Sequence, residues 1–284
     1  MDPAVDPAKK TVLIKIGGRP AEDADTLSVF AQEVTRLAEA GTPVVIVHGG
    51  GALLSDYSKD LGLEPVFKDG IRVTSDKEMP VVDMVLAGLV NKTLVRIFVA
   101  RGAKAVGLCG ADAGTVVGEA IGASGRTGRP FRVDTTLVRD LLRGGYLPIV
   151  APPSADGAGG PLNINADEVA LALSEGLGAK TLVFVSDVPG ILEGGRRLLV
   201  VDPAAGRRLI AEGVVTGGMI PKLNASFEAL GKGVGEVVVG SYRGDGDLAG
   251  LLSGRVGTRV VSEAVSEAVS EAKEEAQSGI GSAE

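Results

Sequence analysis

The chain has 284 residues and a formal net charge of −7, with 45% hydrophobic and 23% charged residues. This composition is typical of a globular protein, and the length allows one large domain or two small ones. The absence of a basic stripe argues against binding to nucleic acid, and the absence of an apolar run of about 18–20 residues argues against a membrane span.

The N-terminal segment, D-P-A-V-D-P-A-K-K, lacks the apolar core of a signal peptide. The single cysteine, Cys109, excludes an internal disulfide and a cysteine-rich metal site. We therefore expect a cytoplasmic protein whose residues 1–10 form a flexible N-terminus.

Six short apolar runs predict buried parallel strands, because they are rich in Val and Ile and do not alternate with polar residues. These runs are Thr11–Ile16, Pro43–Val47, Lys104–Leu108, Tyr146–Ala151, Lys180–Ser186 and Glu236–Val239. Between them, apolar residues recur at helical spacing in Leu27–Ala40, Met79–Ala100, Asp167–Leu177 and Leu223–Gly231. The alternation predicts an α/β fold, a three-layer sandwich around an open, mainly parallel sheet.

Two regions depart from this alternation. The segment Thr115–Asp134 combines Gly and Arg with short Val runs, which predicts β-hairpin excursions at an edge of the sheet. Val-Ser-Glu-Ala occurs three times in tandem over 261–272, and residues 262–284 carry −5 of the net charge. We interpret 262–284 as an acidic low-complexity tail that is solvated or frayed.

Lys15 is the one charged residue in the first apolar run, where an ammonium is costly to bury unless an anion meets it. Its place at the end of a strand, before Gly17 and Gly18, is where ligands bind in open α/β sheets. A lysine that reaches solvent from an edge strand explains it equally well. Spacing alone does not decide between the two.

The second run leads into His48-Gly49-Gly50-Gly51 and then a helix start, and successive N–H groups at such a turn can bind an anion. His48, the only histidine, is better explained as a hydrogen-bonded turn residue than as a catalytic base. Arg72 has the planar fork that suits a carboxylate or phosphate, although in isolation it predicts a surface ion pair.

Three polar residues lie around the start of the third helical segment. Asn165 fits a helix N-cap, with Glu168 three residues on, and Asp167 is favoured in the first turn by the helix dipole. These preferences explain Asp167 fully and leave Asn163 unexplained. Lys222 follows Thr216-Gly217-Gly218 near the start of the last helix, and it too could simply be exposed. No complete Walker, dinucleotide or zinc-protease motif is present.

Together, however, the segments K-I-G-G, V-I-V-H-G-G-G, G-I-R-V-T, M-V-L-A-G-L-V-N-K, N-I-N-A-D, S-D-V-P-G-I-L and T-G-G-M-I-P-K resemble the amino-acid kinase family over 11–261. Within that family they are most similar to enzymes that phosphorylate the γ-carboxylate of N-acetyl-L-glutamate in arginine biosynthesis. The resemblance implies one kinase domain, with an N-lobe over 11–178 for acetylglutamate binding and dimerisation and a C-lobe over 179–261 for ATP.

The resemblance also assigns site residues by position. It implies that Lys15 and Lys222 stabilise the transferred phosphoryl group and that Asp167 positions both. Residues implied to bind acetylglutamate are Gly50, Gly51, Arg72 and Asn163. Residues implied to bind the nucleotide are Gly17, Gly18, Asp187, Val188, Pro189, Gly190, Ile191, Leu192, Val214, Val215 and Thr216. It implies no metal ligand in the chain, with Mg²⁺ held mainly by ATP oxygens.

This reading also accounts for the scarcity of histidine. A γ-carboxylate is already ionised at neutral pH, so the reaction needs charge neutralisation and positioning rather than a general base. Alternatives are a kinase for N-acetylaminoadipate, another carboxylate or carbamate, or a non-catalytic nucleotide-binding protein on the same scaffold. A nicotinamide oxidoreductase is disfavoured by the missing dinucleotide motif.

Two departures from the family pattern stand out. Arginine-inhibited members carry an extra N-terminal helix that joins dimers into a hexamer, whereas about ten residues precede the first strand here. We therefore expect a homodimer without arginine feedback. Ala111 stands where many relatives have Lys, and nothing in the sequence explains the consequence.

Overall fold

A computed structural model describes residues 10–17, 23–68, 70–122 and 125–267 of the chain. Apart from Lys10, the N-terminus predicted to be flexible lies outside the described residues, as does the tail beyond residue 267.

The fold is organised by an eight-stranded sheet with the order β14-β16-β15-β11-β1-β2-β8-β5. Its strands are β1 (Val12–Ile16), β2 (Val44–His48), β5 (Ala105–Cys109), β8 (Leu147–Ala151), β11 (Thr181–Val185), β14 (Val200–Val201), β15 (Glu236–Gly240) and β16 (Thr258–Val260). Neighbours are parallel except β15 and β16, which run antiparallel. All six predicted strands are present, with ends shifted by at most one residue, whereas the short β14 and β16 were not predicted.

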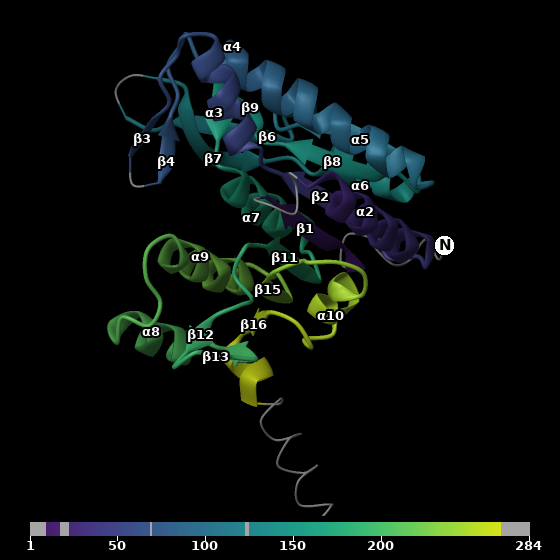
Figure 1. Ribbon diagram of the computed structural model, residues 1–284, viewed down its shortest axis with the longest axis vertical. Coiled ribbons are helices and arrows are strands. Elements are labelled where there is room, and N and C mark those ends of the chain that lie inside the picture. The colour runs from purple at the N-terminus through teal and green to yellow at the C-terminus, as the bar shows by residue number, and fades with distance from the viewer. Residues whose placement is uncertain (1–9, 18–22, 69, 123–124, 268–284) are drawn as a thin grey trace, which may run out of the picture.

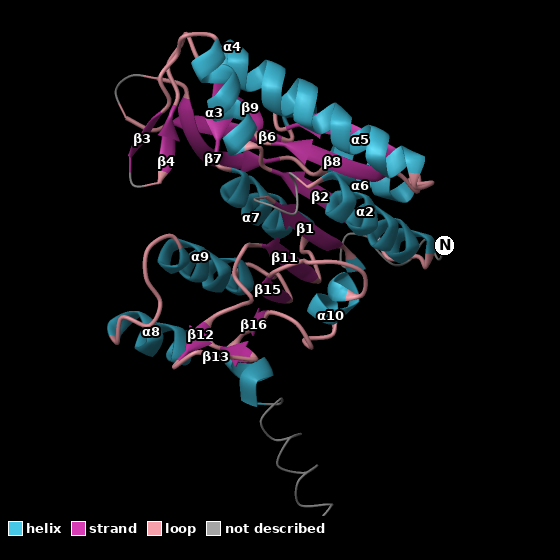
Figure 2. Cartoon of the chain, in the orientation of Figure 1, coloured by secondary structure: helices cyan, strands magenta, loops and turns pink. Residues whose placement is uncertain are grey.

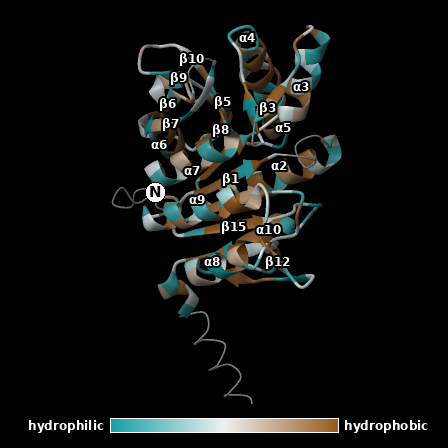
Figure 3. Ribbon diagram, turned by 90° about the vertical axis from the view of Figure 1, so that its left-hand side faces the viewer, coloured by the Kyte–Doolittle hydropathy of each residue, from teal (hydrophilic) through white to brown (hydrophobic). Residues whose placement is uncertain are grey.

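Helices cover both faces of this sheet and make the predicted three layers (Figure 1). One face packs against α2 (Ala24–Glu39), α5 (Asn91–Ala100) and α10 (Asp247–Leu252). The other packs against α6 (Thr136–Arg143), α7 (Ala166–Leu177), α8 (Pro203–Ala211) and α9 (Met219–Gly231). Figure 2 shows the strands between the two sets of helices. In Figure 3 the strands of the sheet are mostly apolar, as expected where both faces are covered.

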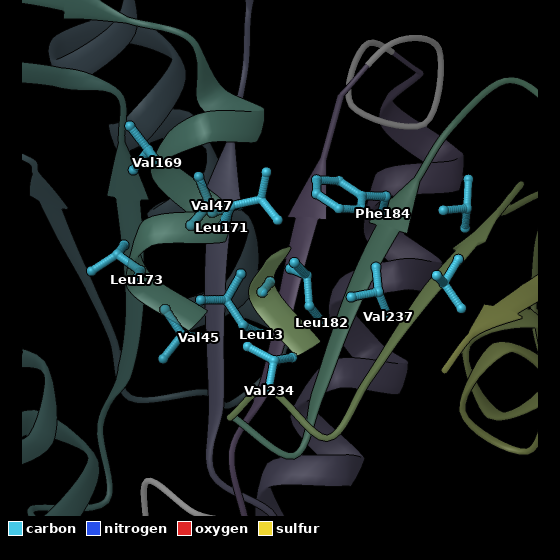
Figure 4. Close-up of a cluster of buried hydrophobic side chains, with 14 of the residues drawn as sticks. Leu13, Val45, Val47, Val169, Leu171, Leu173, Leu182, Phe184, Val234 and Val237 are labelled. Atoms are coloured by element: carbon cyan, nitrogen blue, oxygen red, sulfur yellow. The ribbon is translucent and has the colours of Figure 1, made fainter. Parts of the chain in front are cut away.

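Strand β1 lies in the middle of the sheet, between β11 and β2, and its side chains alternate between the two cores. Val12, Ile14 and Ile16 pack towards α2 and α5. Leu13 packs on the opposite face with residues of β2, β11 and α7 (Figure 4). Lys15 is the next residue on that face. The explanation of Lys15 as a residue of an edge strand is therefore wrong, and the alternation points its side chain towards α7.

The predicted helix over Met79–Ala100 is continuous but contains a change of winding. It comprises α4 (Met79–Val82), a π-helical segment η2 (Asp83–Val90) and α5. Helix α3 (Gly51–Asp60) packs beside this unit, with Leu54 in a small apolar cluster that includes Val82 and Leu86. The π-helical winding has no signature in the sequence pattern.

A second β structure lies beside the sheet. The hairpin predicted within 115–134 is present as β6 (Val116–Ala120) and β7 (Thr127–Val133). Its predicted place at an edge of the main sheet is wrong, because β9 (Pro153–Asp156) and β10 (Pro161–Ile164) pair with it to close a four-stranded barrel. The remaining elements are short: β3 (Val66–Lys68) with β4 (Ile71–Val73), β12 (Leu192–Glu193) with β13 (Arg196–Arg197), and the 3₁₀ turn η3 (Asp112–Gly114).

The start of the tail is helical and mostly exposed, and the prediction of a solvated or frayed appendage stays a prediction for the rest. Residues 263–267 are helical, and the Ser266 hydroxyl lies 2.8 Å from Oδ2 of Asp202. Asp202 is the N-cap of α8, where its other carboxylate oxygen accepts from the Ala205 N–H. The first tail residues therefore share a hydrogen-bonded cap with the body.

Among the described residues, no helix has the length and apolar character to cross a membrane. The main sheet runs without interruption across the predicted lobe boundary at residues 178 and 179, because β11 pairs directly with β1. The division into an N-lobe and a C-lobe stays a prediction.

Candidate active site

Lys15, Asp167 and Lys222, far apart in the sequence, converge beside the carboxyl end of β1. The Lys15 Nζ lies 2.9 Å from Oδ1 of Asp167, and the Lys222 Nζ lies 3.3 Å from Oδ2. The lysine side chains are 16% exposed and the aspartate is 28% exposed. All three groups are thus largely covered but reachable from solvent, as a substrate site requires.

Local sequence places each member. Lys15 points towards α7 by strand alternation. Asp167 lies in the first turn of α7, whose N-cap Asn165 accepts from the Asp167 N–H at 2.8 Å. Lys222 lies in the first turns of α9, with its Nζ 5.1 Å from the centroid of the Phe184 ring. The predicted N-cap at Asn165 is confirmed.

Charge pairing determines the ionisation of Asp167. Burial by itself would raise the pKa of this carboxyl, but the ammonium groups of Lys15 and Lys222 outweigh it and hold the pKa below its usual value. Its neighbour Glu168 behaves in the opposite way. Burial and the Asp167 charge raise the pKa of Glu168, whose Oε2 is buried without a hydrogen-bond partner. The centre is therefore one carboxylate shared by two cations.

Gly17 leaves room for the Lys15 head group. A Cβ atom at this position would lie 2.7 Å from the Lys15 Nζ, closer than side chains approach in proteins. A larger residue here would therefore displace the Lys15 head group. Gly18, which the resemblance assigns with Gly17 to the nucleotide, lies outside the described residues.

A second feature is a cavity of about 360 Å³ beside the start of α3. It brings together all four residues predicted to bind the acidic substrate: Gly50, Gly51, Arg72 and Asn163. Gly50 is the N-cap of α3, and no side chain caps the backbone N–H groups of the first turn. Uncapped N–H groups at a helix start favour an anion.

Arg72 is held on the wall of this cavity by protein acceptors. Its Nη1 donates to Oε1 of Glu78 at 2.8 Å, and both side chains are less than 10% exposed. Its Nη2 donates to the Gly51 carbonyl at 3.2 Å and to the Ser55 hydroxyl. The interpretation of Arg72 as a surface ion pair is therefore wrong, because its partner is buried.

Asn163 lies on β10, where its amide donates to the Thr74 hydroxyl at 2.8 Å. Thr74 in turn accepts on its carbonyl from Arg126 N–H, so the loop after β4 is tied to the small barrel. Sequence reasoning did not find Glu78, Ser55 or Thr74. These residues stand at no regular sequence spacing from their partners, so only the fold brings them together.

The residues assigned to the nucleotide are dispersed around the ends of β11 and α9. Asp187 lines a polar cavity of about 600 Å³ with residues that follow β15 and residues at the start of α2. Ile191 and Val215 are buried in the core, whereas three apolar side chains in the same assignment are 36–40% exposed: Val188, Leu192 and Val214. Gly190 has a φ of 139°. The backbone carbonyl of Thr216 accepts from the Met219 N–H at the start of α9. Their role, with that of Pro189, stays a prediction.

The comparison with protein families decides the relationship. The sequence matches the family described as "Amino acid kinase family" over residues 10–241. The chain belongs to the amino acid kinase family. The matched region contains Lys15, Asp167, Lys222 and every other predicted site residue, and it excludes the acidic tail.

Curated relatives from this family are similar over most of their length. The acetylglutamate kinase of Geobacillus kaustophilus is 41% identical over 232 residues, which is 81% of this chain and 89% of the relative. The acetylglutamate kinase of Kosmotoga olearia is 39% identical over 231 residues, which is 80% and 82% respectively.

Solved structures share the fold. The smu.665 protein of Streptococcus mutans is 27% identical with a TM-score of 0.76, covering 89% of this chain and 99% of that one. Carbamate kinase of Giardia lamblia bound to AMP-PNP superposes with a TM-score of 0.65 at 18% identity, covering 90% and 100%. The predicted amino-acid kinase fold is confirmed.

His48 has the structural role that the sequence favoured. It is fully buried, and its ring nitrogens bond to Gly49 and Asn91. Burial lowers the pKa of His48 to about 4. A fully buried and hydrogen-bonded imidazole agrees with the assignment of His48 as a turn residue rather than a catalytic base.

Proposed function

We propose that this protein transfers the γ-phosphoryl group of ATP to the γ-carboxylate of N-acetyl-L-glutamate, forming N-acetyl-L-glutamyl 5-phosphate for arginine biosynthesis. The observation that carries the proposal is the contact of Lys15 and Lys222 with one carboxylate, Asp167, near a cavity that contains Arg72. Similarity to acetylglutamate kinases over about four fifths of the chain supports the choice of substrate.

The chemistry follows from the charges. An oxygen of the substrate carboxylate attacks the γ-phosphorus, the bond to the β–γ bridging oxygen breaks, and ADP leaves with the electron pair. The carboxylate is ionised at neutral pH, so no proton has to be removed. Two ammonium groups stabilise the charge on the transferred group, and Asp167 keeps them from moving apart.

The acidic substrate would be held at its other end. In the cavity, the α3 N–H groups at Gly50 and Gly51 and the guanidinium of Arg72 are the donors for its carboxylates. The amide of Asn163 lies on the same cavity wall. Fixing both ends orients the attacking oxygen, which is a large part of catalysis in phosphoryl transfer.

Magnesium would enter this centre as a partner of ATP. Among the described residues, no group of three acidic, histidine or cysteine side chains is placed to hold a metal. Asp167 is already shared by two lysines. Mg²⁺ would therefore be held mainly by phosphate oxygens, where it neutralises their charge.

The substrate is tested with a panel of acceptors under ATP and Mg²⁺: N-acetylglutamate, N-acetylaminoadipate, glutamate, aspartate and carbamate. Acyl phosphate is trapped with hydroxylamine and measured as hydroxamate. The proposal requires the highest kcat/KM with N-acetylglutamate. A preference for another acceptor would select one of the alternative kinases, and no hydroxamate with any carboxylate would favour a non-catalytic nucleotide-binding protein.

We also propose a cytoplasmic homodimer. The η2–α5 unit exposes large apolar side chains, Met84, Leu89 and Val99, which suit contact with a second copy. Light scattering coupled to size exclusion should give twice the chain mass. The same preparation tests the predicted insensitivity to arginine, which sub-millimolar inhibition would disprove.

A further inference from the structure

The glycine turn that lines the acidic-substrate cavity is contacted at Gly49 by His48, and His48 in turn contacts Asn91. Both side chains are fully buried. The His48 Nδ1 lies 2.8 Å from the Gly49 carbonyl oxygen, and the Nε2 lies 3.1 Å from the Asn91 amide nitrogen. A carbonyl oxygen can only accept, so Nδ1 carries the proton and Nε2 accepts from Asn91.

The orientation of the Asn91 amide is fixed by its other neighbours. Its Nδ2 also lies 2.9 Å from the Ile149 carbonyl oxygen and 3.2 Å from that of Leu108, and its Oδ1 accepts from the Lys92 ammonium at 2.9 Å. Turning the amide over would place an oxygen against two carbonyls and an NH₂ group against an ammonium. The NH₂ group of Asn91 therefore faces His48 and the two carbonyls, and its two hydrogens are shared among these three acceptors. It reinforces the imidazole tautomer that the Gly49 carbonyl sets.

The π-helical segment brings a second contact to the same turn. Asn91 is the first residue after η2, and a π-helical turn rotates the residues that follow it relative to a regular α-helix. A Cβ on Gly50 would lie 2.9 Å from Leu86 and 3.1 Å from Val90. Leu86 and Val90 therefore leave no room for a side chain at Gly50. Asn91, at the end of the same segment, contacts His48. Local π-helical winding inside helices is frequent at functional sites.

We propose that Asn91 is a positioning residue for the acidic substrate: it acts through His48 to fix the turn whose Gly50 and Gly51 N–H groups receive that substrate. This inference rests on the proposed function. The competing explanation is that Asn91 only satisfies the carbonyls of β5 and β8, in which case its loss would lower stability without affecting one substrate more than the other.

The first test needs no variant. Because the chain has one histidine, ¹⁵N-labelled protein gives a single pair of imidazole nitrogen signals near neutral pH. Asn91 as a donor requires the proton on Nδ1 and a lone pair on Nε2. A proton on Nε2 in the folded protein would overturn the inference even if every variant failed to fold.

The second test compares Asn91→Ala with Thr35→Val. Thr35 makes a buried hydrogen bond within α2, to the Ala31 carbonyl, and does not touch the turn. Asn91→Ala should raise the KM for N-acetylglutamate by about tenfold, the scale of one lost buried hydrogen bond, with the KM for ATP within about twofold. Its imidazole Nε2 signal should shift, because the NH₂ group that faces Nε2 is lost. Thr35→Val should lower Tm and leave both KM values unchanged.

Each other outcome counts against the proposal. An unchanged KM for N-acetylglutamate, or equal rises for both substrates, would make Asn91 a structural residue only. A selective rise with an unchanged Nε2 signal would show that Asn91 does not act through His48. If the wild-type chain does not phosphorylate N-acetylglutamate at all, the proposed function fails first, and this inference fails with it.

Discussion

Lys15 and Lys222 contact different oxygens of the same carboxylate, Asp167, although one comes from the central strand β1 and the other from the first turns of α9. Two ammonium groups so close repel each other unless an anion lies between them. Asp167 supplies that anion in the described structure. A phosphoryl group carrying negative charge would be stabilised by the same pair of cations.

Replacing either lysine should therefore affect the chemical step. Lys15→Ala and Lys222→Ala should each lower kcat by roughly 10²-fold or more, the scale of losing one transition-state donor. The control is Lys232→Ala, which removes a lysine that is 58% exposed and paired with Glu175. The measurement is kcat from steady-state kinetics with both substrates saturating. Near-wild-type kcat in both site variants would refute the mechanism.

The space around Lys15 gives an independent test. Gly17→Ala places a methyl group 2.7 Å from the Lys15 Nζ, so the lysine head group must shift from its position beside Asp167. We expect kcat to fall by about tenfold or more, since misplacing a catalytic group by about 1 Å can cost up to 10²-fold. Gly231→Ala, where a Cβ meets nothing within 4 Å, serves as control and should leave kcat unchanged. Equal activity in the two variants would show that the crowding at Gly17 does not matter.

Local features of the fold could be predicted from the sequence, whereas the order of the strands could not. Strand positions and helix caps were predictable, because apolar runs and N-cap preferences act locally, as at Asn165 and in β1. The choice between a ligand-facing and a solvent-facing Lys15 was open. It depended on β1 being central in the sheet, and strand order is not a local property.

Contacts between distant segments explain the rest of what was missed. The barrel requires β6 and β7 to pair with strands that follow α6, and the hairpin pattern contains no information on that pairing. Glu78 could not be assigned to Arg72, because an ion pair leaves no period in the sequence. The structure gives no physical account of Ala111.

Arg72 should determine affinity for the acidic substrate rather than turnover. Arg72→Lys keeps the charge but loses the planar fork, which bonds Glu78, Ser55 and the Gly51 carbonyl. We expect the KM for N-acetylglutamate to rise by about tenfold or more, the scale of one or two lost charged hydrogen bonds, and the KM for ATP to stay the same. Arg129→Lys, at an exposed pair with Glu119, is the control. An unchanged KM for N-acetylglutamate in Arg72→Lys would remove Arg72 from the substrate site.

The buried His48 should make stability depend on pH in the weakly acidic range. Burial is the main cause that lowers its pKa from 6.5 to about 4, with the Lys92 charge adding to the effect and the hydrogen bond to Gly49 opposing it. Between these two pKa values the unfolded chain binds a proton that the folded chain does not, so the free energy of unfolding falls as the pH falls. The contribution is fully present above pH 6.5 and is lost by about pH 4.

A shift of this size corresponds to about 3 kcal/mol of unfolding free energy across that range. Urea unfolding at a series of pH values measures it, and the matched variant His48→Asn should show a flatter curve over the same interval even if it is less stable at pH 7. Below about pH 4 both curves should also fall because of Asp167. The unfolded chain then protonates this carboxyl, whereas its two lysines hold its pKa below the usual value in the folded protein. Parallel curves between pH 6.5 and 4 would mean that His48 is protonated in the folded state, which its contact with a donor amide on Asn91 does not allow.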